Sequence, residues 1–200
     1  MDREKLKNEI LDLGSDSLEV FGGKFEGGIN LQQRIDEITD LLMFLIENTD
    51  TVDFLEVGAA SGGNTFVFNK YLNIVSTCIV DDNKHPKHGL RPENLKDIEY
   101  DEFIGNSQSK EAVEYVRDKG MVFDIIFIDG DHSYDGVRLD TLNYIKYLKS
   151  GGYVIFHDTV TLNCPGVVRW TKEMSEGYYD DIEYVKTFYD VLGITVFRKK

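Results

Sequence analysis

The chain has 200 residues and a formal net charge of −14, with 36 acidic and 22 basic side chains. A protein that binds nucleic-acid phosphates needs a basic stripe, so this composition excludes nucleic acid as an expected partner. No apolar run approaches the ~20 residues that cross a bilayer, and the charged N-terminus leads into no signal-peptide core, which predicts a cytoplasmic protein without membrane contact. Cys78 and Cys164 are too far apart for a zinc motif and are expected to be buried thiols.

Residues 1–50 are expected to form a helical segment that caps a main domain at residues 51–200. Within this segment, residues 31–48 carry apolar side chains at helical spacing. The preceding stretch, residues 21–28, is rich in glycine and is typical of a flexible loop. We interpret it as a lid over the functional site.

From residue 52 onward, short apolar runs alternate with longer amphipathic ones. This alternation favours a mostly parallel sheet between two layers of helices. The last two runs have only a short connection, so they are expected to form an antiparallel hairpin at the edge of the sheet. The fold predicted is therefore a doubly wound α/β fold with seven strands. Strands are expected at 52–57, 74–80, 98–104, 123–128, 153–156, 182–187 and 193–198, and helices at 65–71, 109–119 and 134–149, the last closed by Gly151-Gly152.

A glycine-rich turn from Glu56 to Gly63 joins the first of these strands to a helix. Gly58 permits the tight turn, and the short side chains after it let a ligand approach the backbone closely. The free amides at the start of the helix can bind a carboxylate or a phosphate. The alternative is a turn that serves packing alone.

The pattern of this turn separates two kinds of cofactor. A dinucleotide fingerprint requires its second glycine where Ala60 stands, which counts against an NAD(P)-dependent oxidoreductase. Instead, the turn reads E-x-G-x-x-x-G, which resembles motif I of class I S-adenosylmethionine-dependent methyltransferases. The resemblance implies that backbone amides of the turn hold the methionine part of the cofactor. The cofactor-binding residues expected here are Glu56, Gly58, Ala59, Ala60, Ser61 and Gly62.

An acid at the end of the second strand is expected to bind the ribose. Asp81 lies about 23 residues beyond Gly58, where a carboxylate can accept hydrogen bonds from both ribose hydroxyls. It is preferred over Asp82 because it comes directly after the strand. The resemblance places the adenine contacts after the third strand, at Asn106 and Ser107, where exposed turn residues are the alternative.

Two polar clusters follow the fourth and fifth strands, at residues 129–135 and 157–159. Ligands of open α/β sheets bind outside the carboxyl ends of the strands, so both clusters are expected to meet the glycine-rich turn. Methylation of a hydroxyl needs a deprotonated and oriented oxygen. A divalent cation on Asp129 and Asp158 would lower the pKa of that hydroxyl, and a nearby histidine would accept its proton.

The stretch 123–158 resembles the cephalosporin-hydroxylase-like and macrolide-sugar O-methyltransferases, and more distantly the catechol and caffeoyl-coenzyme A O-methyltransferases. The resemblance covers roughly residues 50–160. It implies that Asp129 is a metal ligand beside the cofactor, that His132 is the general base, and that His157 and Asp158 complete the metal site. Metal-dependent relatives have Glu-Asp or Asp-Asn where this chain has His157-Asp158. Either the cation is softer than Mg²⁺, or His157 lies outside its ligand shell.

The sequence thus predicts a methyltransferase that uses S-adenosylmethionine to methylate a hydroxyl of a small molecule such as a sugar or a phenol. Its second expected cofactor is Mg²⁺ or Mn²⁺. Two alternatives remain, an NAD(P)-dependent oxidoreductase and a non-catalytic domain that only binds a nucleotide. The resemblance is also compatible with a homo-oligomer formed through the N-terminal segment.

Overall fold

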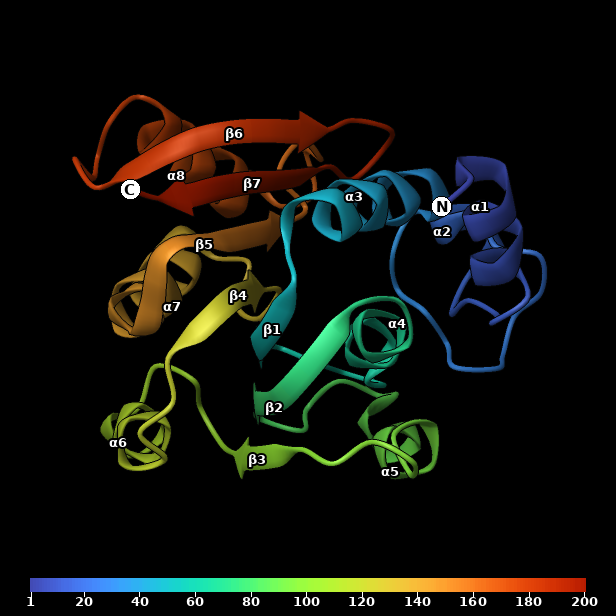
Figure 1. Cartoon of the computed structure of the whole chain (residues 1–200), viewed down its shortest axis with the longest axis horizontal. Helices are drawn as coiled ribbons and strands as arrows, with labels where there is room; N and C mark the ends of the chain where they lie inside the picture. Colours follow the sequence, from blue (N-terminus) through green and yellow to red (C-terminus); the bar gives the residue numbers. More distant parts are fainter.

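Near-continuous apolar runs form the centre of a seven-stranded sheet in the computed structural model, which describes residues 1–200 (Figure 1). The strand order is β3-β2-β1-β4-β5-β7-β6, so the direction of winding reverses between β1 and β4. All neighbouring pairs are parallel except those of β7, which is antiparallel to both β5 and β6. The strands are β1 (Thr51–Val57), β2 (Asn73–Asp81), β3 (Asp101–Ile104), β4 (Phe123–Ile128), β5 (Leu148–His157), β6 (Ile182–Phe188) and β7 (Ile194–Lys199).

Helices cover both faces of the sheet, and the sheet separates the two main parts of the apolar core (Figure 1). Helices α1, α3 and α4 pack on one face, and α6, α7 and α8 pack on the other. None of the helices combines the length and the hydropathy that a membrane-spanning helix requires. The helices are α1 (Arg3–Leu11), α2 (Leu18–Phe21), α3 (Ile35–Asn48), α4 (Gly63–Tyr71), α5 (Arg91–Asn94), α6 (Lys110–Asp118), α7 (Tyr134–Tyr144) and α8 (Pro165–Ser175), with two 3₁₀ turns, η1 (His88–Leu90) and η2 (Ile145–Tyr147).

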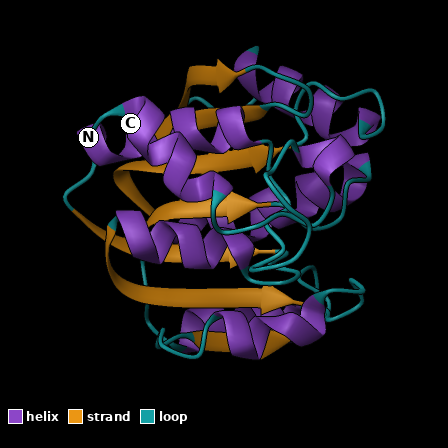
Figure 2. Ribbon diagram, turned by 90° about the vertical axis from the view of Figure 1, so that its right-hand side faces the viewer, coloured by secondary structure: helices purple, strands orange, loops and turns teal.

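The register of the central strands places three loops at one level of the sheet edge. Val57 at the end of β1 pairs with Ile128 at the end of β4, and Ile128 pairs in turn with Phe156 of β5. The residues that come after Val57, Ile128 and Phe156 therefore lie next to one another at this edge of the sheet. Figure 2 shows the loops gathered where most of the strand arrowheads end. This edge is the switch point at which open α/β sheets bind ligands.

Glu37 on α3 ties the N-terminal segment to the tip of the β6–β7 hairpin. Its side chain is buried, and one carboxylate oxygen, Oε1, accepts hydrogen bonds from four consecutive backbone amides, 190–193, at 2.8–3.0 Å. Arg34, which precedes α3, adds an ion pair of 2.7 Å to Asp190 at the same tip. The hairpin loop and α3 are thus fixed to one another, although more than 150 residues separate them along the chain.

The predicted fold is confirmed, including the antiparallel hairpin at the sheet edge. The predicted end of one helix was wrong, because the helix expected at 134–149 ends at Tyr144 and is followed by η2. Strand β5 begins at Leu148, so Gly151 and Gly152 lie inside a strand instead of closing a helix. The Lys149 side chain explains the early strand start, since its ammonium group bonds to carboxylates of β1 and β4 at 2.7 and 2.8 Å. The third strand is also shorter than predicted, at Asp101–Ile104.

Candidate functional site

A cavity of about 860 Å³ opens at the carboxyl ends of β1, β2, β4 and β5. The N-terminal segment contributes Val20, Phe21 and Gln32 to its wall, and the hairpin tip contributes Leu192. Two of the predicted cofactor-binding residues, Glu56 and Gly62, do not line the cavity. The other predicted site residues all line it: Gly58, Ala59, Ala60, Ser61, Asp81, Asn106, Ser107, Asp129, His132, His157 and Asp158.

Gly58 brings the glycine-rich turn against the loop that carries the first acid. Its φ of +84° lies in the left-handed region, and a Cβ at this position would lie 2.2 Å from the backbone oxygen of Asp129. Only glycine therefore allows both the turn and this close approach. Because of that approach, the backbone of the turn and the side chains of the β4 loop face the same cavity.

Two buried acceptor atoms near the turn have no partner within the protein. They are Oε1 of Glu56 and Oδ1 of Asn64, and the latter residue lines the cavity. The other oxygen of Glu56 accepts a hydrogen bond from Thr65 Oγ1. Burial raises the pKa of Glu56 to about 7. Unpaired buried acceptors are costly in the absence of a ligand, and they suit a ligand that carries a donor such as an ammonium group.

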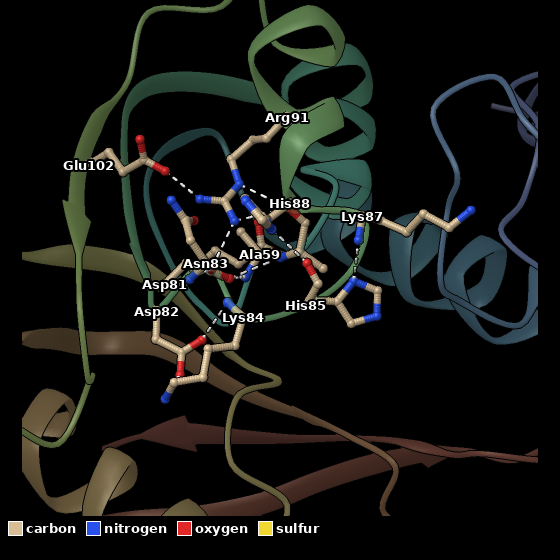
Figure 3. Close-up of polar contacts among 12 residues, drawn as sticks. Ala59, Asp81, Asp82, Asn83, Lys84, His85, Lys87, His88, Arg91 and Glu102 are labelled. Atoms are coloured by element: carbon tan, nitrogen blue, oxygen red, sulfur yellow. Dashed lines mark hydrogen bonds and ion pairs between the residues drawn. The ribbon is translucent and has the colours of Figure 1, made fainter.

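Asp81 is held by a buried network at the end of β2 (Figure 3). Its carboxylate accepts hydrogen bonds from the amides of Ala59 and Ala60, at 2.7 and 3.0 Å, and forms a 2.9 Å ion pair with Arg91. Arg91 also donates two hydrogen bonds to the Ala60 carbonyl and pairs with Glu102. Burial alone would raise the pKa of Asp81, but the Arg91 charge holds it below its ordinary value. Asp81 thus fixes the turn, and its binding of ribose stays a prediction.

The four polar side chains predicted after β4 and β5 meet in one cluster. His132 Nε2 lies 3.2 Å from Oδ1 of Asp129 and 3.5 Å from Oδ2 of Asp158. His157 Nδ1 lies 3.3 Å from the second oxygen of Asp129 and 3.5 Å from the same Asp158 oxygen. Asp158 adopts a left-handed backbone conformation, with φ of +60°. Strain of this kind in a non-glycine residue is found mostly at functional sites.

The two histidines and two carboxylates of this cluster shift one another's pKa values. Burial alone would lower the pKa of His157, but the Asp129 and Asp158 carboxylates raise it to about 10. The hydrogen bond to Asp129 is the main reason that the pKa of His132 is raised. Burial alone would raise the pKa of Asp129, but the charge of His157 and the hydrogen bond from His132 hold it below its ordinary value. Asp129, His157 and Asp158 each offer a ligand atom within 4.8 Å of the others, so this set fits a divalent cation in place of the proton.

Several residues that contact the predicted site residues were not singled out from the sequence, and Gln33, Cys164 and Asp140 are three of them. Gln33, fully buried before α3, donates a hydrogen bond of 3.3 Å to Asp129 Oδ2. Cys164 Sγ lies 3.3 Å from His132 Nδ1. Asp140 on α7 accepts a 2.7 Å hydrogen bond from Ser107, one of the residues predicted to contact adenine. Among them, only Asp140 carries a sequence signal, since it is an acid between apolar positions on the inner face of α7.

Substitution of Asp140 with asparagine should stabilise the protein in a pH-dependent way. Burial raises the pKa of Asp140 to about 7 in the folded state, whereas its ordinary value is 3.8. Between these two pH values the folded protein keeps a proton on Asp140 that the unfolded protein has lost. Stability attributable to this group therefore falls as the pH rises from 3.8 to 7. Because asparagine does not ionise, the gain in unfolding free energy should be about 2 kcal/mol larger at pH 8 than at pH 5.5. Denaturant unfolding at both pH values, with the exposed Asp135→Asn as control, measures this difference. An equal gain at both would contradict it.

Comparison with known proteins gives one family match and one curated relative. A family model described as a methyltransferase domain matches residues 55–159. An uncharacterized protein of Acanthamoeba polyphaga mimivirus is 30% identical in an alignment of length 123 that covers 54% of this chain and 52% of that protein. The chain thus spans about half the length of the curated relative it matches.

Solved structures with the same fold carry methyl-transfer cofactors. The O-methyltransferase TomG from Streptomyces achromogenes, in complex with S-adenosylmethionine, aligns with a TM-score of 0.67 and 14% identity over 100% of this chain and 99% of its own. An O-methyltransferase from Bacillus cereus in complex with S-adenosylhomocysteine aligns with a TM-score of 0.64 and 13% identity. This alignment covers 98% of this chain and 91% of the other. The N-methyltransferase NodS from Bradyrhizobium japonicum, also in complex with S-adenosylhomocysteine, aligns with a TM-score of 0.61 and 16% identity. This alignment covers 98% of this chain and 97% of the other. At these identities the similarity shows the fold, which is shared by enzymes with different acceptor atoms.

Proposed function

This chain belongs to the methyltransferase domain family, within the class I S-adenosylmethionine-dependent methyltransferases, and on that premise we propose that it methylates a hydroxyl of a small molecule with the help of a divalent cation. The observation that carries this proposal is the meeting of Asp129, His132, His157 and Asp158 beside the glycine-rich turn in one cavity. A family member that only bound its cofactor would have no need of a histidine between two carboxylates.

The cofactor is proposed to occupy the half of the cavity next to the glycine-rich turn. S-adenosylmethionine supplies an electrophilic methyl group when it is bound. The Asn64 Oδ1 acceptor is unpaired and suits the ammonium group of the methionine part, and the amides at the start of α4 suit its carboxylate. At the end of β2, Asp81 is the proposed ribose ligand, and Asn106 with Ser107 is proposed to contact the adenine.

The acceptor hydroxyl is proposed to lie next to His132. A divalent cation on Asp129 and Asp158 would lower the pKa of that hydroxyl when bound. His132 is the most exposed member of the cluster, at 42% of its side chain, so it reaches an incoming substrate. Its Nε2 faces the two acids, which orient the ring and stabilise the imidazolium that forms when it accepts the hydroxyl proton. His157, almost fully buried, is proposed as the third ligand and favours a cation softer than Mg²⁺, such as Mn²⁺.

Calorimetric titration tests the cofactor half of this proposal. The purified protein is expected to bind S-adenosylhomocysteine and to show no heat of binding with NADH. Ala60 occupies the position of a fingerprint glycine with φ of +44°, so a dinucleotide pyrophosphate lacks its usual backbone approach. Binding of NADH without binding of S-adenosylhomocysteine would contradict the proposal.

Chelation tests the metal half. With acceptor and cofactor present, excess EDTA should lower the rate of methyl transfer by at least about tenfold, since the hydroxyl then loses the cation that lowers its pKa. Added Mn²⁺ or Mg²⁺ should restore the rate in the wild-type protein. In the Asp158→Asn variant, which lacks one ligand, restoration should need much more metal. A full rate in excess chelator would show that the acids serve another purpose.

A further inference from the structure

We infer that His132, Asp158 and Cys164 form a binding site for a thiophilic divalent cation of the zinc class. Each of the three offers a ligand atom within 4.8 Å of the other two. This set is distinct from Asp129, His157 and Asp158, although both include Asp158. A tetrahedral zinc site of the open type has three protein ligands of this kind and leaves its fourth position to water or a small ligand.

The site is built by three separate elements that are packed closely together. His132 lies in the loop before α7, Asp158 follows β5, and Cys164 is the N-cap residue of α8. Gly166 in the first turn of α8 makes the approach possible, because a Cβ there would lie 2.5 Å from the backbone oxygen of His132. The Cys164 side chain makes no capping hydrogen bond to α8, so its sulfur is free to face the histidine.

The mixture of ligands selects the class of cation. A thiol is a poor partner for Mg²⁺, whereas Zn²⁺ and Co²⁺ combine sulfur, imidazole and carboxylate ligands readily. Burial and the nearby Asp158 carboxylate raise the pKa of the Cys164 thiol, and a bound cation would displace its proton. The sulfur stands at the N-terminus of an 11-residue helix, whose positive end favours the resulting thiolate.

Occupation of this site has a consequence for catalysis, and this consequence rests on the proposed function. A His132 nitrogen that binds the cation no longer has a lone pair for the hydroxyl proton. The same chain would thus be activated by Mn²⁺ or Mg²⁺ at one set of ligands and inhibited by a cation of the zinc class at the other. Inhibition by zinc is therefore expected to require Cys164.

Titration of the reduced protein with Co²⁺ alone tests the site without any reliance on activity. A cobalt–thiolate bond gives a near-ultraviolet charge-transfer absorption, which is expected to appear, to saturate at one ion per chain and to disappear when Zn²⁺ is added. The band should be absent in Cys164→Ser. It should persist in Cys78→Ala, a matched control because Cys78 is the other cysteine and is fully buried in the core. No band in the wild type, or a band that survives Cys164→Ser, overturns the inference.

A second measurement separates this inference from the proposed function. If the protein methylates an acceptor, Zn²⁺ should inhibit the Mn²⁺-supported rate of the wild type at least tenfold more strongly than that of Cys164→Ser, each relative to its own zinc-free rate. Equal inhibition of both would overturn the catalytic consequence of the site. If no methyl transfer occurs while the cobalt band behaves as expected, the proposed function fails and the metal site stands.

Discussion

Replacement of His132 by alanine is expected to lower kcat by about 10²–10⁴-fold while the affinity for S-adenosylhomocysteine stays unchanged. The polar partners of this histidine are Asp129, Asp158 and Cys164, none of which belongs to the glycine-rich turn. Its loss therefore removes proton transfer and leaves the cofactor site intact. Steady-state kinetics and calorimetry on the same preparation measure both quantities.

Two controls distinguish a base from a residue that only supports the loop. Added imidazole should restore part of the rate of His132→Ala, because the small base can occupy the space of the missing ring. Asp135→Asn, an exposed substitution in the first turn of α7, should leave the rate unchanged. If His132→Ala retained wild-type turnover, another group would have to accept the proton.

Replacement of Arg91 by methionine is expected to lower the unfolding free energy by about 3–5 kcal/mol. Arg91 is 2% exposed, and its loss leaves the buried Asp81 carboxylate without its cation and the Ala60 carbonyl without two donors. The affinity for S-adenosylhomocysteine should also fall, since the glycine-rich turn loses this support. Chemical denaturation followed by circular dichroism gives the change in stability.

A comparison of two ion pairs near α5 tests the reason for that loss. Lys96 and Glu93 form an exposed pair, so Lys96→Met should leave the stability almost unchanged. The double variant Arg91→Met with Asp81→Asn should recover part of the stability of Arg91→Met, because no unpaired charge remains buried. Equal losses for Arg91→Met and Lys96→Met would show that burial of the charge is not the cause.

The central strands and the polar residues that follow them could be predicted because an apolar run that ends in polar residues is visible in the local sequence. The apolar run at 123–128 matches β4 at both ends, and the polar residues that follow it lie in the cavity. The end of α7 was not predictable from the same kind of pattern. There the chain turns into β5 because Lys149 reaches carboxylates on two other strands, a contact that requires the tertiary structure.

The parts of the site that escaped prediction depend on contacts between distant segments. The spacing between Cys164 and Cys78 predicts only a buried thiol. In the fold, Cys164 lies against His132, which is 32 residues earlier in the chain. Gln33 reaches Asp129 across 96 residues without any local motif. Arg91 lies in a helix of four residues, which is too short to show a helical repeat of apolar residues in the sequence. Such partners are recognisable only after the strand order is known.

The four amides at the hairpin tip have the form of an anion receptor whose anion is already part of the protein. In many proteins a row of backbone amides of this kind holds phosphate from solution. Here the Glu37 carboxylate is covalently attached to α3, so its local concentration depends on neither buffer nor salt. Because the contact is buried, ionic strength screens it little. Leu192 and the adjoining wall of the cavity should therefore keep their shape in solutions of very different composition.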